Sequence, residues 1–257
     1  MTSAVVTGAA LGIGRAIAGR LVADGMHVVG LDLNDDALAT ARDELGDRFE
    51  AVVGDVGDWN AHERAADAAQ RAGELRGWVN NAGVDWVGAA HEIDADHIER
   101  GLRVLQLGTM YGACIAVRRM LPARAGSIVN ISSIQGVVAF PRYFTYDVAK
   151  AAILMVTRSI AVDYGAHGIR CNTILPGCIE TPMTYAGLPP GLSRDEALRR
   201  EGELAPMLRV GQPAEIAEVA AFLLSDRASY LTGTEIAVDG GATARCFPYP
   251  PLDTGGE

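Results

Sequence analysis

The amino-acid sequence predicts an α/β protein with a doubly wound parallel sheet of about seven strands flanked by helices. Short β-branched runs alternate with longer amphipathic runs along the chain, which is the order that strand–helix–strand units produce. The strand runs are apolar at nearly every position, as in strands covered on both faces. Right-handed crossovers then place them in one sheet. The 257 residues, 49% of them hydrophobic, suffice for one large core, so we expect a single domain.

The first half of the chain alternates four strands with three helices. "SAVVT" is a β-branched run that stops at Gly8, and apolar residues then recur at helical period until Gly25. The next helix has Asn34 or Asp35 as its cap and Gly46 as its stop. In order, we expect a strand at 3–7, a helix at 13–25, a strand at 27–33, a helix at 35–45, a strand at 48–56, a helix at 62–73 and a strand at 75–83.

The second half continues the alternation and adds two loop regions. A helical pattern runs from about 95 to 121, and the longest helical run follows the strand "GSIVNISS". The density of proline and glycine predicts loops at 181–193 and in the tail 247–257. The remaining expected elements are a strand at 126–133, a helix at 146–165, a strand at 169–177, a helix at 213–225 and a strand at 234–241.

Composition and charge exclude several classes of protein. A formal net charge of −10 argues against nucleic-acid binding, which needs clustered Lys and Arg. No run reaches the ~18 apolar residues of a membrane span, and the opening apolar run is too short for a leader. The cysteines, at 114, 171, 178 and 246, show no CxxC and no His partner at ligand spacing. We therefore expect no metal site, reduced thiols and a cytoplasmic protein.

A glycine loop, "TGAALGIG", joins the first strand to the first helix. Its glycines allow a tight turn and let a pyrophosphate approach the N–H groups at the start of the helix. A strand before the loop and a helix after it are the context of a nucleotide-binding turn. The cofactor contacts predicted here are Gly8, Leu11, Gly12, Ile13 and Gly14.

An acidic residue at the end of the second strand indicates which dinucleotide binds. Asp32 stands 18 residues beyond Gly14, where a carboxylate can accept hydrogen bonds from both ribose hydroxyls of an adenosine. It would repel a 2′-phosphate, and Leu33 and Asn34 supply no compensating cation. Asp32 and Leu33 are therefore predicted to contact NAD. A methyltransferase that uses S-adenosylmethionine could show the same loop and the same acid.

Four further motifs separate these alternatives. "NNAG" at 80–83 follows a strand, Ser133 ends another, and Tyr146 and Lys150 lie thirteen and seventeen residues beyond Ser133. "PGCIET" follows at 176–181. Together with the glycine loop, in this order and spacing, they resemble the classical short-chain dehydrogenase/reductase family over nearly the whole chain. A methyltransferase would leave Ser133, Tyr146 and Lys150 without a shared task.

The resemblance implies a single-domain Rossmann fold and a role for each motif. Tyr146 would be the general acid/base, Lys150 would stabilise its anion and bind the nicotinamide ribose, and Ser133 would bind the substrate oxygen. The catalytic and dinucleotide-binding domain would span 1–246, with a substrate lid at about 181–206. The remaining cofactor contacts that it implies are Asp55, Val56, Asn81, Ala82, Gly83, Pro176, Gly177, Ile179 and Thr181.

One position departs from the family pattern. The family's catalytic tetrad usually has an asparagine about 27 residues before the serine, and this sequence has Gln106 there. The amide chemistry is kept on a side chain one methylene longer, so we count Gln106 as a catalytic residue in a proton relay. A non-catalytic dinucleotide sensor is a further alternative, and Gln106 is the one feature that favours it.

The substrate pocket is expected to be mainly apolar, so a cyclic or apolar secondary alcohol or ketone fits it. The apolar residues expected there are Trp86, Val137, Val138, Phe140, Met183, Tyr185, Leu188 and Leu192, with Tyr143 as a wall. A sugar would need more polar contacts, some of which Asp85, Gln135 and His91 could provide. A homotetramer or homodimer is expected through the helical segments 95–121 and 144–164, which carry Met110, Ile115, Ile153, Met155 and Ile160.

Overall fold

Seven parallel strands form one sheet in the order β3-β2-β1-β4-β5-β6-β7. The structure is a computed structural model that describes residues 1–186 and 191–245. The strands are β1 (Thr2–Thr7), β2 (His27–Asp32), β3 (Phe49–Val53), β4 (Glu74–Asn80), β5 (Gly126–Ile131), β6 (Ile169–Pro176) and β7 (Glu235–Val238). The predicted seven-stranded doubly wound sheet of a single Rossmann-like domain is confirmed.

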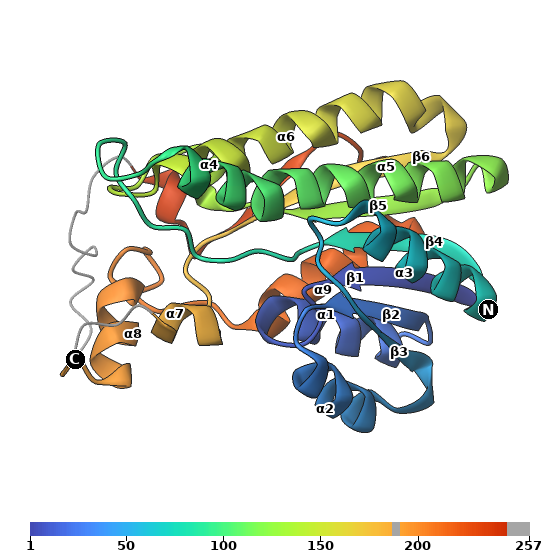
Figure 1. The fold of residues 1–257 in the computed structure, drawn as a ribbon, viewed down its shortest axis with the longest axis horizontal. Coiled ribbons are helices and arrows are strands. Elements are labelled where there is room, and N and C mark those ends of the chain that lie inside the picture. Colours follow the sequence, from blue (N-terminus) through green and yellow to red (C-terminus); the bar gives the residue numbers. More distant parts are fainter. Residues whose placement is uncertain (187–190, 246–257) are drawn as a thin grey trace, which may run out of the picture.

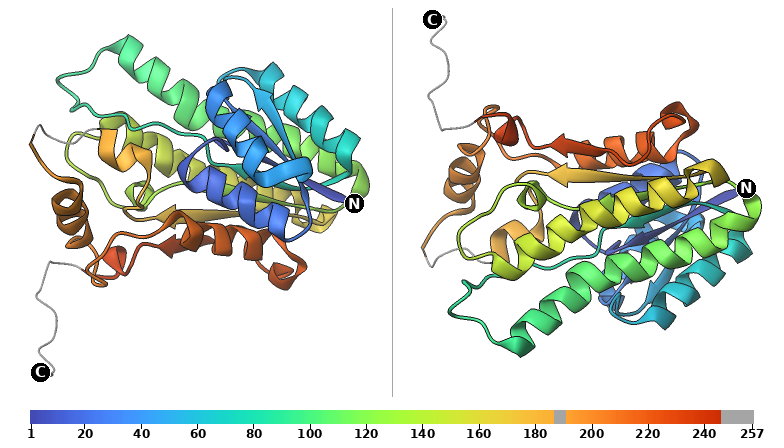
Figure 2. Two further views of the ribbon diagram at one scale, coloured as in Figure 1. Left: turned by 90° about the horizontal axis from the view of Figure 1, so that it is seen from below. Right: turned by 90° about the horizontal axis from the view of Figure 1, so that it is seen from above.

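Helices cover both faces of the sheet (Figure 1). They are α1 (Gly12–Ala23), α2 (Asp35–Leu45), α3 (Trp59–Ala72), α4 (Ala95–Leu102), α5 (Gly108–Met120), α6 (Phe144–Tyr164), α7 (Pro182–Ala186), α8 (Arg194–Gly202) and α9 (Pro213–Leu224). One buried apolar cluster joins α1, α2 and α9 to one face, and a second joins α3 and α5 to the other. Figure 2 shows α5 and α6 side by side over that second face. The helices α7 and α8 lie beyond the carboxyl ends of the strands.

A chain of buried polar side chains ties the central strands together. The Asn80 amide donates to Asn130 at 2.8 Å, and the Asn130 amide donates to the Thr157 hydroxyl at 2.8 Å. Thr157 in turn meets Thr173 at 2.6 Å. These bonds link β4, β5, α6 and β6, and buried polar groups that are fully paired in this way give the core a specific register. The ends of those elements carry the site.

The helical segment predicted at 95–121 is interrupted. A π-turn at Arg103–Leu107 separates α4 from α5, and such a widened turn inserts a residue into the helical ladder. Gly108 follows the π-turn and packs closely against Val56, because a Cβ on Gly108 would lie 2.9 Å from Val56 Cγ2. Periodicity alone does not reveal a π-turn, since the apolar pattern shifts by only one position.

The segment between β6 and α9 contains two helices that were not predicted: α7 lies within 181–193, which was expected to be loop, and α8 follows directly after it. Ser193 caps α8 by accepting a hydrogen bond from the Glu196 backbone N–H at 3.2 Å, with Asp195 and Glu196 in the first turn. These are ordinary N-terminal helix signals, which the density of Pro and Gly just before them obscured. The tail 247–257 lies outside the described residues.

Three of the residues expected at an oligomer interface belong to the core instead. Ile115, Ile153 and Ile160 are 0%, 1% and 9% exposed, because the apolar stripes of α5 and α6 face the sheet. Met110 and Met155 are 37% and 58% exposed. The homo-oligomer stays a prediction that rests on such exposed apolar residues. No helix in the described part of the chain is long and apolar enough to cross a membrane.

Candidate active site

A cleft of about 1490 Å³ opens at the carboxyl ends of the strands. It lies where the strand order reverses, between β1 and β4, which is the usual ligand position in a doubly wound sheet. Pockets for a small ligand span ~300–1,000 Å³, so this cleft has room for a dinucleotide and a substrate together. The described residues bring no group of three His, Cys, Asp or Glu side chains together as metal ligands.

The glycine loop leaves space that side chains would fill. Gly8 and Gly12 have φ of +66° and +56°, a region that favours glycine. A Cβ on Gly14 would lie 2.0 Å from the Gly8 carbonyl oxygen, so the first turn of α1 contacts the end of β1 closely. Gly8, Gly12, Leu11 and Ile13 line the cleft. A cradle of this shape before a helix N-terminus fits the pyrophosphate of a dinucleotide.

Asp32 lies at the end of β2 on the cleft wall. Its two carboxylate oxygens each accept one backbone hydrogen bond at 3.0 Å, from Ala10 and Asn34. Those bonds fix the side chain and leave lone pairs free, because an ionised carboxylate has about four acceptor positions. Leu33 is 66% exposed and stands outside the cleft lining. The geometry fits a ribose with free hydroxyls.

Asp55 and Val56 occupy the turn after β3. The Asp55 carboxylate accepts the Gly57 backbone N–H at 2.7 Å, and Val56 is 6% exposed. Neither residue lines the cleft, so their contact with an adenine stays a prediction. Sequence reasoning did not foresee the structural task of Asp55, which is to close this turn.

The "NNAG" turn connects β4 to the glycine loop. The Asn81 amide donates to the carbonyl oxygens of Thr7 and Gly8 at 3.0 and 3.2 Å, and the backbone N–H groups of Asn81 and Ala82 donate to the Thr7 hydroxyl. Asn81, Ala82 and Gly83 line the cleft. Asn81 therefore holds the ends of β1 and β4 together beneath the cofactor groove.

Ser133, Tyr146 and Lys150 meet on the opposite wall of the cleft. Ser133 follows β5, and its hydroxyl lies near the Tyr146 phenol, where it favours the phenolate. Lys150 lies one helical turn after Tyr146 on α6, with its ammonium 5.4 Å from the centre of the phenol ring. That ammonium donates to the Ile131 carbonyl at 3.1 Å. The predicted couple is thus held by the end of β5 and by the start of α6.

Burial controls the acid–base properties of this group. Burial raises the pKa of Tyr146 well above its ordinary value, and the Ser133 hydroxyl opposes that rise. Burial also lowers the pKa of Lys150 to about 8. Lys150 is 4% exposed yet still mainly protonated at neutral pH. Its charge is therefore available to favour the phenolate, which the desolvated phenol does not form readily alone.

Gln106 lies in the π-turn rather than in a regular helix. It is partly buried and stands outside the cleft lining, whereas Leu105 beside it is fully buried. A Cβ on Gly83 would touch Leu105 Cδ2 at 3.5 Å, so the π-turn runs directly behind the cofactor wall. The relay role of Gln106 stays a prediction.

The segment after β6 forms the far rim of the cleft and leads into the lid. Pro176, Gly177, Ile179 and Thr181 all line the cleft. A Cβ on Gly177 would lie 2.8 Å from the Asp239 Cα. Thr181 reaches across the groove to the glycine loop, because its Cγ2 would be 3.2 Å from a Cβ on Gly12. The far rim of the cleft therefore lies within contact distance of the glycine loop, and the contact of this segment with a nicotinamide stays a prediction.

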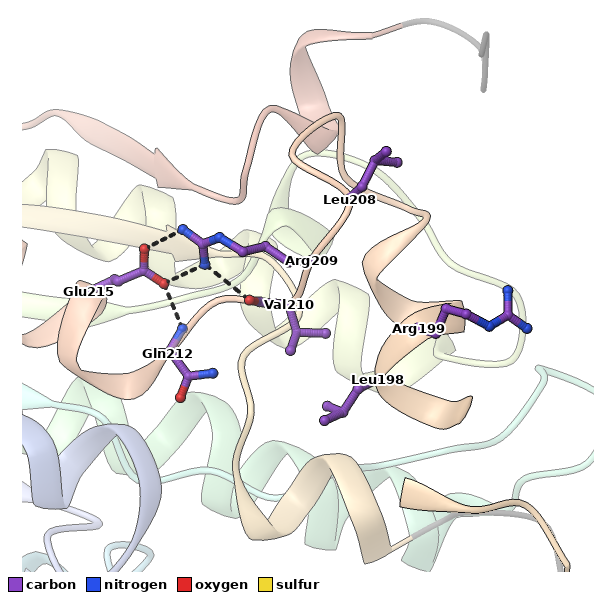
Figure 3. Close-up of a pocket in the computed structure, with 7 residues that line it drawn as sticks. All are labelled: Leu198, Arg199, Leu208, Arg209, Val210, Gln212 and Glu215. Carbon is purple, nitrogen blue, oxygen red and sulfur yellow. Dashed lines mark hydrogen bonds and ion pairs between the residues drawn. The ribbon is translucent and has the colours of Figure 1, made fainter. Parts of the chain in front are cut away.

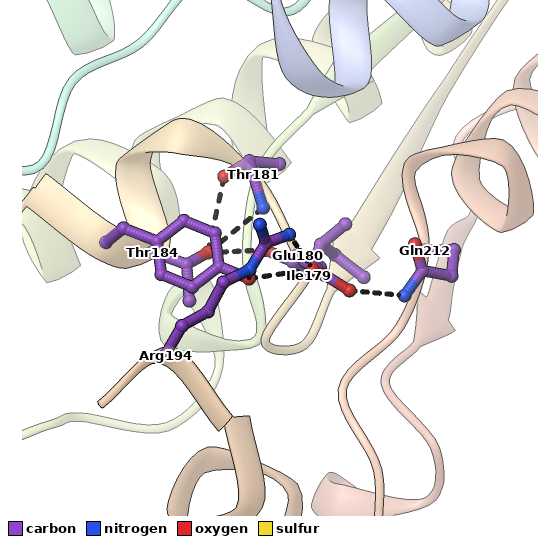
Figure 4. Close-up of polar contacts among 7 residues, drawn as sticks. Ile179, Glu180, Thr181, Thr184, Arg194 and Gln212 are labelled. Atoms are coloured by element: carbon purple, nitrogen blue, oxygen red, sulfur yellow. Dashed lines mark hydrogen bonds and ion pairs between the residues drawn. The ribbon is translucent and has the colours of Figure 1, made fainter. Parts of the chain in front are cut away.

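Polar contacts anchor the lid to this rim (Figure 4). The Tyr185 hydroxyl donates to Glu180 at 2.7 Å and the Gln212 amide donates to it at 2.8 Å, with Arg194 as a third partner. Hydrogen bonds from Gln212, Arg194 and Tyr185 lower the pKa of Glu180 to about 2. Glu180 is thus a fixed anion that joins α7, α8 and the segment before α9. Thr184 adds a bond of 2.6 Å to the Ile179 carbonyl.

The substrate end of the cleft differs in part from the sequence prediction. The expected residues that do line it are Asp85, Gln135, Val138, Phe140, Tyr143, Met183 and Leu192. Trp86 instead turns onto α4, where its indole N–H donates to the His97 carbonyl at 3.0 Å. Tyr185 bonds Glu180, and Val137 and His91 stand outside the lining. Leu188 lies outside the described residues.

Several cleft residues were missed by sequence reasoning. Asp239, Gly240 and Gly241 line the cleft after β7, and the Asp239 carboxylate closes that turn by accepting the Gly241 N–H at 2.8 Å. Glu201 and Arg209 reach the cleft from the lid. The "VDGG" spacing was a usable signal for the first group. Nothing in the local pattern around Glu201 and Arg209 distinguishes them from solvated helix charges.

Comparison with known proteins agrees with this geometry. A family model described as "Enoyl-(Acyl carrier protein) reductase" matches residues 8–243. Cis-4-hydroxycyclohexanecarboxylate dehydrogenase of Sinomonas cyclohexanicum is 41% identical over 94% of this chain and 96% of its own length. 2-(R)-hydroxypropyl-CoM dehydrogenase of Xanthobacter autotrophicus is 38% identical over 94% of this chain and 98% of its own length.

Solved structures show the same relationship. Levodione reductase has a TM-score of 0.89 at 31% identity, covering 95% of this chain and 98% of that one. The ligand-free aldohexose dehydrogenase of Thermoplasma acidophilum has a TM-score of 0.88 at 33% identity, covering 98% and 97%. The chain belongs to the short-chain dehydrogenase/reductase family of oxidoreductases. The cofactor of that family's dehydrogenases is a nicotinamide dinucleotide.

Proposed function

We propose that the protein transfers a hydride between NAD(H) and an alcohol/carbonyl pair, with a cyclic or largely apolar secondary alcohol or ketone as substrate. The observation that carries the proposal is one cleft with Asp32 at one end and Ser133, Tyr146 and Lys150 at the other. Apolar walls from Val138, Phe140, Met183 and Leu192 support the apolar substrate. The relatives named for cyclic alcohols are consistent with it.

The chain's own groups supply the proton chemistry. In oxidation, the substrate hydroxyl binds between the Ser133 hydroxyl and Tyr146, and the Tyr146 phenolate takes its proton while the carbinol C–H bond breaks. In reduction, the phenol gives that proton to the carbonyl oxygen. Lys150 holds a positive charge beside the phenol and so favours the phenolate. A bound nicotinamide supplies the hydride acceptor or donor.

Two alternatives lose support. A methyltransferase does not need Ser133, Tyr146 and Lys150 at one point of the cleft, and the family match argues against it. A non-catalytic sensor would tolerate damage to this triad, and none is present. The deciding experiment screens cyclic and acyclic secondary alcohols with NAD and ketones with NADH, followed at the nicotinamide absorbance. Binding of NAD with no turnover across the panel would favour the sensor.

The preference for NAD over NADP is expected to depend on Asp32. Asp32→Ser removes a carboxylate from the ribose end of the cleft, so we expect the NADP:NAD ratio of kcat/KM to rise by roughly 10- to 100-fold. Asp35→Ser is the matched control, because it removes the same charge from the exposed start of α2 and should leave the ratio unchanged. A wild-type enzyme that works better with NADP would contradict this account of Asp32.

The relay role of Gln106 is tested by two substitutions. If its amide anchors a relay water, Gln106→Asn should keep or raise turnover, and Gln106→Leu should lower turnover without weakening NAD binding. If Gln106 only satisfies buried groups in the π-turn, Gln106→Leu should lower the melting temperature instead and leave turnover per folded molecule unchanged. Turnover, its solvent isotope effect and the melting temperature together separate the two roles.

A further inference from the structure

The carboxylate of Asp85 lies at the substrate end of the cleft, and Tyr143 lies between it and the Tyr146 phenol. Asp85 lines the cleft beside Tyr143 and Tyr146. Burial raises the pKa of the Asp85 carboxyl, and interactions with the Tyr143 phenol and the Trp86 backbone N–H oppose that rise. An ionised carboxylate can only accept hydrogen bonds, so Asp85 offers acceptor positions to the cleft. The ring of Tyr143 meets that of Tyr146 edge-on, with centroids 5.8 Å apart.

A second carboxylate faces the same space from the lid. Glu201 lies near the end of α8 and lines the cleft. Burial, and after it the charge of Glu201, raise the pKa of the Cys178 thiol on the far rim. Burial, and after it the charges of Asp85 and Glu201, raise the pKa of the Tyr143 phenol. The substrate therefore enters between two acids that come from opposite sides of the cleft.

The four basic side chains on the described cleft wall each contact another protein group. Lys150 is buried behind Tyr146 and bonded to Ile131. Arg209 is paired with Glu215 at 2.7 and 2.9 Å, as Figure 3 shows. Arg200 pairs with Glu196 at 2.5 Å, and Arg245 donates to the carbonyls of Glu203 and Leu204. The residues outside the described part, 187–190 and 246–257, include no Lys, Arg or His.

The acceptors that the substrate end offers are carboxylates. Asp85 lines the cleft from the turn after β4, and Glu201 lines it from α8. The Gln135 backbone N–H donates to the Ser133 hydroxyl at 3.1 Å, but its Oε1 is buried and so is not open to a ligand in the cleft. A substrate hydroxyl can donate to a carboxylate, whereas a substrate carboxylate is repelled by it.

We propose that Asp85 determines the substrate class of this cleft: it binds a second hydroxyl of an uncharged cyclic diol or polyol and excludes substrates that carry a carboxylate. This inference rests on the proposed alcohol/carbonyl activity and narrows it. The proposed substrate differs from that of the 41%-identical relative, which is named for a hydroxycyclohexanecarboxylate. Asp85 acts on the choice of substrate, whereas Ser133 and Tyr146 act on the reacting oxygen.

The test compares three kinds of ligand with the enzyme and its Asp85→Asn variant. They are cyclohexanol, the 1,2-, 1,3- and 1,4-cyclohexanediols, and cis-4-hydroxycyclohexanecarboxylate. With wild-type enzyme and NAD, we expect one or more diols to exceed cyclohexanol about tenfold in kcat/KM, as a hydrogen bond to a charged group provides. The carboxylate should fall about tenfold below cyclohexanol. In Asp85→Asn, the carboxylate:cyclohexanol ratio should rise about tenfold and the diol:cyclohexanol ratio should fall.

The matched control is Asp195→Asn, which makes the same chemical change on an exposed residue of α8 outside the cleft lining. It should leave every ratio as in the wild type, which excludes an effect of net charge. Tyr143→Phe removes the phenol that interacts with Asp85, so it should reduce the diol preference in the same direction as Asp85→Asn. Ratios that do not move in Asp85→Asn would overturn the proposal.

A binding measurement keeps the inference separate from the proposed activity. The same ligands are titrated into the enzyme–NADH complex by calorimetry, because an alcohol and NADH form a complex that does not react. A preference for diols that Asp85→Asn removes supports the inference even if no alcohol in the panel is oxidised, and only the proposed activity then fails. Equal dissociation constants for all three kinds of ligand would overturn the inference even if turnover is normal.

Discussion

Tyr146→Phe is expected to remove most turnover while NAD binding stays nearly intact. The substitution takes away one hydroxyl, which carries the proton that Tyr146 would exchange with the substrate. General acid–base catalysis contributes ~10²–10⁴-fold, and we expect a loss of kcat in that range. The ring itself stays, so its contacts with Tyr143 and with the Lys150 ammonium are kept. Initial rates at saturating NAD and a separate NAD titration measure the two effects.

Tyr143→Phe is the matched control for this prediction. Its phenol interacts with the Asp85 carboxylate, and its ring lies 5.8 Å from that of Tyr146. We expect this variant to keep turnover of a simple alcohol within about tenfold of the wild type. If Tyr146→Phe retains near-normal turnover, Tyr146 is not the acid/base. If both variants lose turnover equally, the loss reflects the shape of the pocket.

Lys150→Met is expected to abolish activity and to make the apoprotein more stable. Burial lowers the pKa of Lys150 from 10.5 to about 8. The charged side chain therefore lowers the free energy of unfolding of the wild type by ~3 kcal/mol at pH 7. The variant also loses the hydrogen bond to the Ile131 carbonyl, which lowers its gain in stability by ~1 kcal/mol. The net ~2 kcal/mol corresponds to a melting temperature about 4–8 °C higher in a domain of this size.

The gain in stability should depend on pH in a defined direction. Because the pKa of Lys150 is lower in the folded state, the unfolded chain binds more protons between pH 8 and 10.5, and the wild type becomes more stable as pH rises through that window. Lys150→Met lacks this term. The gain of the variant should therefore be largest below pH 8, and above about pH 10.5 only the loss of the hydrogen bond to Ile131 should remain, so that the variant becomes slightly less stable than the wild type there. A variant that is less stable at pH 7 would contradict the proposed burial cost.

The alternation of strands and helices could be predicted because each element carries its own periodicity. The β-branched run before Gly8 and the helix that follows it are local patterns, and the sheet of seven strands follows from repeating them. The π-turn at Arg103–Leu107 was not visible, since it changes hydrogen bonding without changing composition. The helix that begins after Ser193 was hidden by the prolines and glycines beside it.

The candidate site was predictable where spacing carries the chemistry. Tyr146 and Lys150 are four residues apart, so one helix face places them together wherever the helix lies. Gly8 and Gly14 come together because a strand–turn–helix unit of this length allows little else. The direction of single side chains was not predictable. Trp86 turns onto α4 instead of the pocket because His97, eleven residues on, offers its indole a carbonyl oxygen.

The sequence by itself determined the fold class, the position of the glycine loop and the placement of Tyr146 and Lys150 on one helix face, because periods and short spacings fix these locally. The catalytic role of that pair was predicted from the family resemblance and not from the spacing. Only the tertiary structure decided which charges meet in the cleft. The charge of Asp85 raises the pKa of the Tyr143 phenol although the two residues are 58 positions apart in the sequence, and Glu201 acts on the Cys178 thiol from α8. Such pairs join segments that are distant in the chain, and their geometry is set when loops and lid pack against the ends of the strands.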